Sequence, residues 1–165
     1  MPFQKSINLN PPLAVEGSFA SVSNTHNVLA GTQQFVADTA GVTMARFAYA
    51  DLATGKVTTV KPSSLTNVAV GFVRRGDNTA VITSWLGDST LVIPAGYGVT
   101  LYDRGDFWVK TSTAATVGQA VFQNDTTGII STGTAGASVA GATEIPLFKV
   151  ASIGAANSLI KISAF

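Results

Sequence analysis

The chain has 165 residues, of which 46% are hydrophobic and 12% are charged, with no cysteine and a formal charge of +1. A chain of this length buries about 70% of the surface of its unfolded form, so it can hold a core without disulfides or structural zinc. The absence of cysteine excludes thiolate chemistry. The charged share is half of the usual value of about 25%, which indicates that much of the surface meets other protein.

The charge pattern and the hydropathy pattern exclude several kinds of partner. Arg74 and Arg75 are the only adjacent cations, so there is no basic stripe for nucleic acid. The longest uncharged stretch, 126–143, consists mainly of Gly, Thr, Ser and Ala, so no membrane span is expected. No apolar run follows Lys5, so we expect no secretory signal and a product that stays in the cytoplasm of the cell that makes it.

The first 27 residues differ in pattern from the rest of the chain. They contain three prolines, several Asn and Ser residues, and isolated apolar residues without a sustained period, which predicts an extended N-terminal arm over 1–27. Fourteen extended residues reach roughly 45 Å, against a radius of gyration near 15 Å for a compact domain of this length. The arm residues that we expect at an interface with a partner or another subunit, by their apolar or rigid character, are Phe3, Ile7, Leu9, Pro11, Pro12 and Leu13. The alternative is that residues 7–15 fold back as an edge strand of the same domain.

From Val28 onward the hydrophobic period is near two and β-branched and aromatic residues dominate, which predicts a single β-rich domain over 28–165. A strand and a turn recur about every ten residues, so the sequence favours an all-β fold, an antiparallel β-barrel or sandwich with the extended arm. Residues 113–119 and 133–142 are rich in small residues and are expected as loops, with a short helix over 135–140 left open. The predicted strands cover 42–49, 57–60, 68–74, 80–85, 90–93, 98–102, 107–111, 120–122, 128–132, 147–151 and 158–165.

Turn-forming residues separate these strands. Residues 51–56 end in Gly55-Lys56 and predict a hairpin turn. They do not form a phosphate-binding loop, because that pattern would need a glycine where Ala50 stands. Residues 103–106, Asp-Arg-Gly-Asp, also predict a hairpin turn, in which each aspartate bonds nearby backbone.

The sequence offers no catalytic or metal-binding set. His26 is the only histidine and lies in a polar stretch without a triad or metal spacing, so a solvent-facing or locally hydrogen-bonded side chain is expected. A Cys/His zinc site cannot be assembled. Asp103 and Asp106 are the closest carboxylate pair, and the turn accounts for them. We therefore expect a protein that is not an enzyme and that holds no cofactor and no metal.

Aromatic residues are concentrated in 85–108. In residues 106–110 the alternation places Phe107 on one face of a strand and Trp108 on the other. Phe107 is expected in the core, and Trp108 either packs in the core or faces a partner subunit; it joins the arm residues as a candidate interface residue. Trp85, Tyr97 or Trp108 could instead serve as a platform for stacking on sugars.

Several segments together resemble a known family. They are Pro11-Pro12-Leu13-Ala14-Val15-Glu16-Gly17, residues 41–51 closing in Gly55, residues 71–75, residues 91–102 with Ile93-Pro94-Ala95-Gly96, and Gly105-Asp106-Phe107-Trp108-Val109. Over residues 11–125 the chain resembles the structural cement, or decoration, proteins of tailed-phage capsids. Residues 126–156 have no counterpart in this resemblance.

The resemblance implies a structural role and no catalytic residues. It implies binding to the outer surface of a shell built from the major capsid protein, in the virion, with the protein bridging neighbouring subunits. A homo-oligomer, preferably a trimer, is expected by analogy with decoration proteins. Two alternatives stay open: a carbohydrate-binding β-module of a phage tail or fibre, and a trimeric all-β nucleotide hydrolase, for which the chain shows no catalytic motif.

Overall fold

The structure is a computed structural model and describes residues 14–22, 24–76 and 90–164. These residues form strands and connecting loops, and no helix is found among them. The strands are β1 (His26–Asn27), β2 (Val36–Ala37), β3 (Val42–Thr43), β4 (Phe47–Asp51), β5 (Lys56–Thr58), β6 (Val68–Val73), β7 (Val92–Ile93), β8 (Leu101–Lys110), β9 (Ala120–Asn124), β10 (Ile130–Gly133), β11 (Ala142–Val150) and β12 (Leu159–Ala164).

One sheet runs through the molecule in the order β10-β9-β11-β12-β8-β6-β4-β5-β2, with β1 paired to β8 beside this path and β3 paired to β7 in a second sheet. All strand pairs are antiparallel except β2 with β5. The predicted all-β class is confirmed. The described strands do not close into a barrel, and they are compatible with a sandwich.

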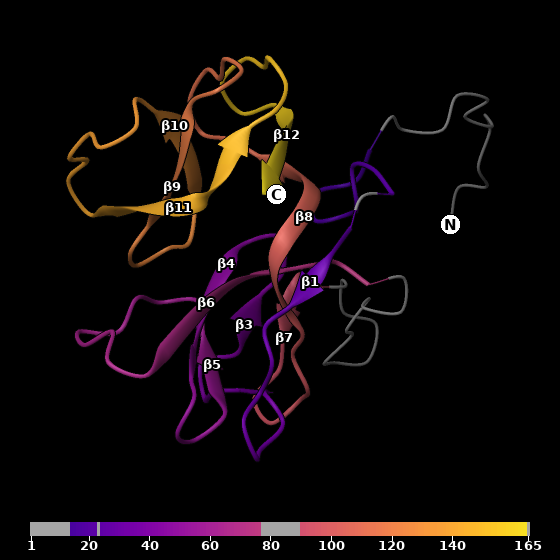
Figure 1. Ribbon diagram of the computed structural model, residues 1–165, viewed down its shortest axis with the longest axis vertical. Coiled ribbons are helices and arrows are strands. Elements are labelled where there is room, and N and C mark those ends of the chain that lie inside the picture. The colour runs from indigo at the N-terminus through magenta and orange to yellow at the C-terminus, as the bar shows by residue number, and fades with distance from the viewer. Residues whose placement is uncertain (1–13, 23, 77–89, 165) are drawn as a thin grey trace, which may run out of the picture.

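Strand β8 joins two lobes (Figure 1). Its first residues, Leu101 and Tyr102, pair with β6, while residues 105–110 pair with β12. We call residues 28–76 and 90–100 the N-terminal lobe and residues 111–164 the C-terminal lobe. Because β8 pairs with strands of both lobes, a force on β8 is transmitted to both lobes.

The other edge of β8 is covered by the beginning of the described chain. In β1, Asn27 pairs with Tyr102 of β8, and before β1, Phe19 forms an isolated bridge to Phe107 of β8. The Ala20 N–H donates to the Asp106 carbonyl oxygen at 2.8 Å. Residues 17–20 and 26–27, within the predicted arm, therefore pair antiparallel with β8 of their own chain. The division into an arm over 1–27 and one domain over 28–165 stays a prediction.

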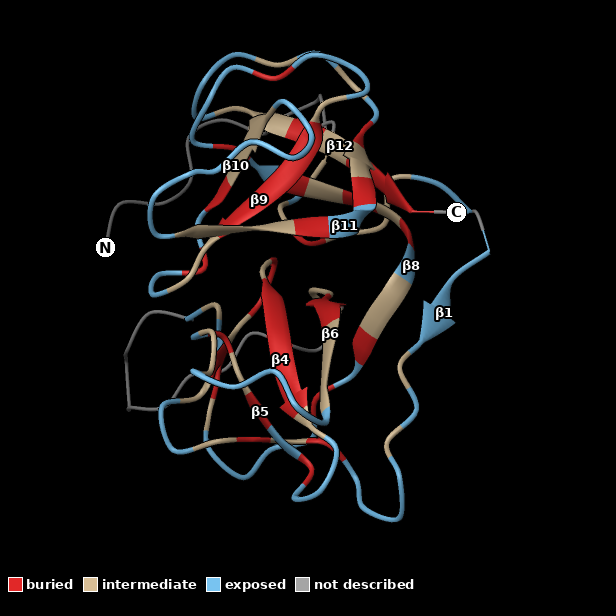
Figure 2. Ribbon diagram, turned by 60° about the vertical axis from the view of Figure 1, so that its left-hand side comes forward, coloured by how far each residue is buried: buried red, intermediate tan, exposed pale blue. Residues whose placement is uncertain are grey.

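Strand β4 is buried on both faces, because its residues alternate between two hydrophobic clusters (Figure 2). Phe47 packs in a cluster with residues of both lobes, including Phe107 and Phe148. Ala48 and Ala50 face a second cluster inside the N-terminal lobe. The first cluster therefore holds the two lobes together through aromatic contacts, which stabilise beyond the area they bury.

The turn predicted over residues 103–106 is wrong. These residues lie inside β8, which continues from Leu101 to Lys110. Arg104 pairs with His26 on one side, and Gly105 pairs with Ala164 on the other. Backbone pairing on both edges thus outweighs the local turn preference of the sequence. Gly105 has a φ of 131°, a conformation that glycine tolerates and that lets the strand bend.

The hairpin turn predicted over residues 51–56 is confirmed, with the Gly55 N–H donating to the Asp51 carbonyl oxygen at 2.8 Å and a φ of 71° at Gly55. The small-residue segment 134–141 is a loop, as predicted, and the short helix left open there is not formed. Strand β11 begins at Ala142, earlier than predicted, and its register shifts between Ile145 and Lys149, around Pro146. A proline has no N–H for the ladder, so a bulge is the expected place for it.

Candidate functional site

The two aromatic neighbours in β8 face opposite sides, as the alternation predicted. Phe107 is fully buried and packs against Phe72 with ring centroids 4.5 Å apart. Trp108 is half-buried on the outer face, where the Lys161 ammonium lies 5.1 Å from the ring centroid. A cation over an indole ring is attracted by the ring quadrupole. Phe107 is therefore a core residue, and an outer part of Trp108 is accessible to a partner.

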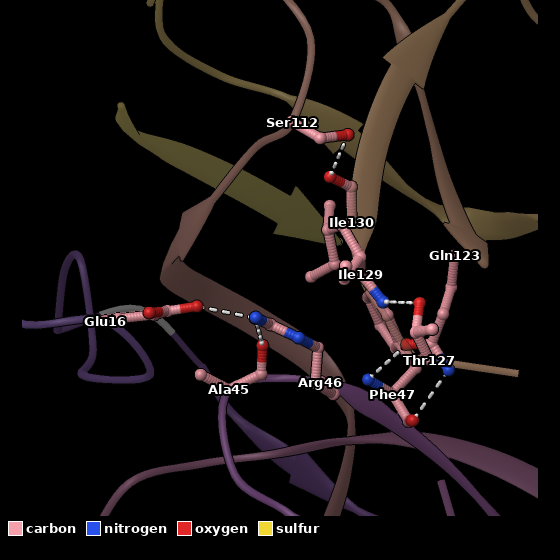
Figure 3. A network of polar contacts seen from close by, with 9 residues as sticks. All are labelled: Glu16, Ala45, Arg46, Phe47, Ser112, Gln123, Thr127, Ile129 and Ile130. Atoms are coloured by element: carbon pink, nitrogen blue, oxygen red, sulfur yellow. Dashed lines mark hydrogen bonds and ion pairs between the residues drawn. The ribbon is translucent and has the colours of Figure 1, made fainter. Parts of the chain in front are cut away.

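The segment before β1 is fixed to the backbone at Trp108. The Gly17 N–H donates to the Trp108 carbonyl oxygen at 2.7 Å, and the Trp108 N–H donates to the Ser18 carbonyl oxygen at 2.9 Å. Next to these bonds, Arg46 Nη1 lies 2.5 Å from Glu16 Oε1 and 2.9 Å from the Ala45 carbonyl oxygen (Figure 3). Residues 16–18 are thus held by backbone hydrogen bonds and by the ion pair of Glu16 with Arg46.

The other candidate interface residues all belong to the first 13 residues, which lie outside the described part of the chain. They are Phe3, Ile7, Leu9, Pro11, Pro12 and Leu13. The structure therefore describes Trp108 and residues 16–18, and the role of the other candidate interface residues stays a prediction.

The polar residues that could suggest catalysis have local partners. The His26 side chain is 60% exposed, in line with the expected solvent-facing side chain, and its Nδ1 lies 2.6 Å from Oδ1 of Asp103, a partner that is distant in the sequence. Asp106 accepts hydrogen bonds from the hydroxyls of Ser21 and Ser163. These contacts tie β8 to β1, to β12 and to Ser21 in the segment before β1. Asp103 and Asp106 thus act as strand-joining residues.

Between the lobes lies a pocket of about 260 Å³, which we call the inter-lobe pocket. Its walls come from β4, β6 and β11 and are mostly apolar, and the side chains of Leu65 and Leu147 are half exposed at it. Two carboxylate residues, Asp103 and Glu144, also contribute to the lining. The lining residues are Phe47, Tyr49, Leu65, Val70, Asp103, Thr143, Glu144, Ile145, Pro146, Leu147 and Phe148.

Tyr49 is an unusual wall residue. It is 2% exposed, and its hydroxyl has no hydrogen-bond partner among the described residues. Burial raises the pKa of Tyr49 to about 12, and the negative charge of Asp125 adds to the rise. A buried hydroxyl without a partner costs about 1–3 kcal/mol. The same residue also lines a polar pocket of about 390 Å³ beside β5.

No sequence pattern predicts the inter-lobe pocket. Its walls come from residues 47–70, from Asp103 and from residues 143–148, which the chain brings together only through the β8 connection. The single local signal is Pro146 within an apolar run, which indicates a break in a strand ladder but not a cavity.

Within the part of the chain that the structure describes, no three His, Asp or Glu side chains come close enough to hold a metal ion. A helix long and apolar enough to span a membrane is likewise not found among these residues. Of the residues proposed for stacking on sugars, the structure describes two: Tyr97 lies in the loop before β8 and is 62% exposed, and Trp108 lies in β8 and is half-buried.

Comparison with known proteins identifies the family. No curated protein sequence matches the chain. A chain from a solved structure described as "The capsid of Myoviridae Phage XM1" has a similar fold, with a TM-score of 0.65 at 15% identity over 99% of this chain and 97% of that chain. The model of the XM1 gp53 minor capsid protein family matches residues 3–164, which confirms the resemblance to phage capsid proteins. The chain therefore belongs to the XM1 gp53 minor capsid protein family and is a structural protein of a phage capsid.

Proposed function

We propose that this protein is a cement protein that binds the outer surface of a phage head and bridges subunits of the major capsid protein. The family match over residues 3–164 is the observation that carries the proposal, because it covers both lobes and nearly all of the arm. A minor capsid protein without an enzymatic role is also in keeping with the lack of a catalytic motif in the sequence.

The contacts that fix residues 16–18 support a role in which the protein carries a mechanical force between capsid subunits. Gly17 and Ser18 bond to the backbone of Trp108, and Glu16 pairs with Arg46. A pull on residues 1–13 is therefore received by β8, whose pairing with both β6 and β12 spreads it over the whole fold. This is the arrangement that a bridge between subunits of a pressurised shell requires.

Exposed apolar side chains supply further contact surface. Val22, Leu29 and Ile153 are at least 78% exposed, and each is uncharged surface that a partner could cover. Monomeric proteins rarely leave large contiguous apolar patches open, so we expect a part of these residues to be covered in the virion. A trimer around a threefold position of the shell is the preferred assembly.

Reconstructions of the virion with and without this protein test the proposal. We expect density on the outside of the shell that touches two major capsid subunits, with well over 800 Å² buried per copy, since smaller areas are typical of packing contacts. A protein bound inside the shell, or touching one subunit only, would contradict a bridging cement function.

A further inference from the structure

We propose that the inter-lobe pocket receives the N-terminal segment 1–13 of a neighbouring copy, with Phe3 as the anchoring side chain. The inference rests on the proposed function, since it names where the arm of a cement protein is received. It links copies of this chain to one another on the shell.

The pocket has the size and polarity of a receptor for a peptide side chain. Its volume of about 260 Å³ lies below the roughly 300–1,000 Å³ of small-molecule sites. Leu65 and Leu147 line it and are 50% and 54% exposed. Apolar walls with open leucines favour an aromatic or aliphatic anchor.

Tyr49 gives a second and independent indication. Its hydroxyl is buried and lacks a partner in the described structure, whereas buried polar groups are normally hydrogen-bonded. A peptide backbone laid across this wall offers carbonyl oxygens, which a tyrosine O–H can donate to after a small movement. A purely apolar guest would leave the hydroxyl as it is.

The charges of segment 1–13 suit the pocket. The segment carries Lys5 and no acidic residue. The pocket lining includes Asp103 and Glu144 and no cationic residue, and the partners of these two carboxylates are His26 and the Lys149 ammonium at 3.6 Å. A cation beside Phe3 would thus approach a lining whose own charged residues, Asp103 and Glu144, are both acidic, with the ammonium groups of Lys61 and Lys149 behind the lining residues Thr143 and Glu144.

The length of the segment permits an exchange between copies. Thirteen extended residues reach roughly 43 Å from the point where residues 16–18 are fixed. An arm that leaves one copy and enters a pocket on the next makes a head-to-tail contact, and such contacts form a ring when the rotation between copies closes. A ring of three copies is the assembly preferred above.

Disulfide trapping tests the inference, because the natural chain has no cysteine. Full-length tagged Gln4→Cys protein is mixed with full-length untagged Leu65→Cys protein under mild oxidation, on shells and in solution. The matched control replaces Leu65→Cys with Val117→Cys, which is also exposed, at 63%, but lies on a loop of the C-terminal lobe outside the pocket lining. A tagged Phe3→Ser/Gln4→Cys chain tests the anchor.

On shells we expect the tagged-to-untagged disulfide to form about tenfold faster with Leu65→Cys than with Val117→Cys, because docking raises the effective concentration of the two thiols. Phe3→Ser should reduce this difference to near the control rate. Equal rates for the two partner variants would overturn the inference. So would a single-chain Gln4→Cys/Leu65→Cys variant that forms only intrachain disulfides.

Binding of the Gln4→Cys protein to shells is measured in parallel. If the protein binds shells and no disulfide to residue 65 forms, the receiving site is wrong while the cement function stands. If the disulfide forms between copies and the protein does not bind shells, the pocket assignment stands and the cement function is wrong.

Discussion

The side-chain amide of Gln123 in β9 pairs with both backbone polar groups of Phe47 in β4. Phe47 N–H donates to Gln123 Oε1 at 2.6 Å, and Gln123 Nε2 donates to the Phe47 carbonyl oxygen at 2.8 Å (Figure 3). Gln123 is fully buried. The Gln123 side chain thus satisfies the backbone N–H and carbonyl oxygen of Phe47 across the lobes, as a neighbouring strand would within a sheet.

Gln123→Ala is expected to lower the free energy of unfolding by about 3 kcal/mol, because it leaves a buried N–H and a buried carbonyl without their partner. Chemical denaturation measures the change. Gln119→Ala is the control, since its amide bonds to the Thr116 N–H at an exposed site, and it should cost below about 1 kcal/mol. Equal losses in the two variants would show that the contact to Phe47 contributes nothing specific.

Phe107→Ala should cost about 3–5 kcal/mol, as expected for an aromatic residue removed from a core. Trp108→Ala should cost less stability and should weaken self-association or shell binding, because its side chain lies on the outer face. Unfolding and shell co-sedimentation are measured on both variants. If both lose the same stability and neither loses binding, Trp108 is only a structural residue.

The raised pKa of Tyr49 makes stability sensitive to alkaline pH. With a pKa of about 12 in the folded protein and about 10 when unfolded, the unfolded state loses its proton first. Below pH 10, Tyr49 makes its full contribution to the free energy of unfolding. This contribution is lost between pH 10 and 12 and amounts to about 2 kcal/mol. Tyr49→Phe should remove this part of the alkaline loss and should not destabilise the protein at pH 7. Identical pH profiles for the two proteins would contradict the assignment.

Gly71 in β6 lies where two strands approach closely. A Cβ at this position would stand 2.8 Å from the Leu101 Cβ and 3.2 Å from the Tyr102 backbone nitrogen. Gly71→Ala should therefore cost about 1–3 kcal/mol through overpacking. Gly31→Ala is the control, because the nearest atom to its Cβ, the Leu52 carbonyl oxygen, is 3.8 Å away. If both variants, or neither of them, lowered the melting temperature, the close approach of the strands at Gly71 would not be what excludes a side chain there.

The sequence predicted those features that depend on alternation and local turns. Phe107 inside and Trp108 outside follow from the period of a strand, and the turn at Gly55 follows from its residues. It failed at residues 103–106, where two flanking strands hold a turn-forming sequence extended. Pairing across long sequence separations decided that segment, and no local pattern reports it.

The candidate site shows the same division. The residues of the arm and Trp108 could be selected by their chemistry, but the inter-lobe pocket and the partnerless hydroxyl of Tyr49 arise only when β4 and β11 are brought together. Likewise, Gln123 is a polar residue between apolar neighbours in β9, and only the fold gives it Phe47 as a partner.

Deletion of residues 1–10 tests the central claim most directly. Shell binding by co-sedimentation and the melting temperature are measured for the truncated and the full-length protein. We expect the truncated protein to lose shell binding and to keep its melting temperature, because the anchoring contacts of residues 16–18 remain in place. A truncated protein that still decorates shells normally, or that melts markedly lower, would contradict the account of a bridging arm.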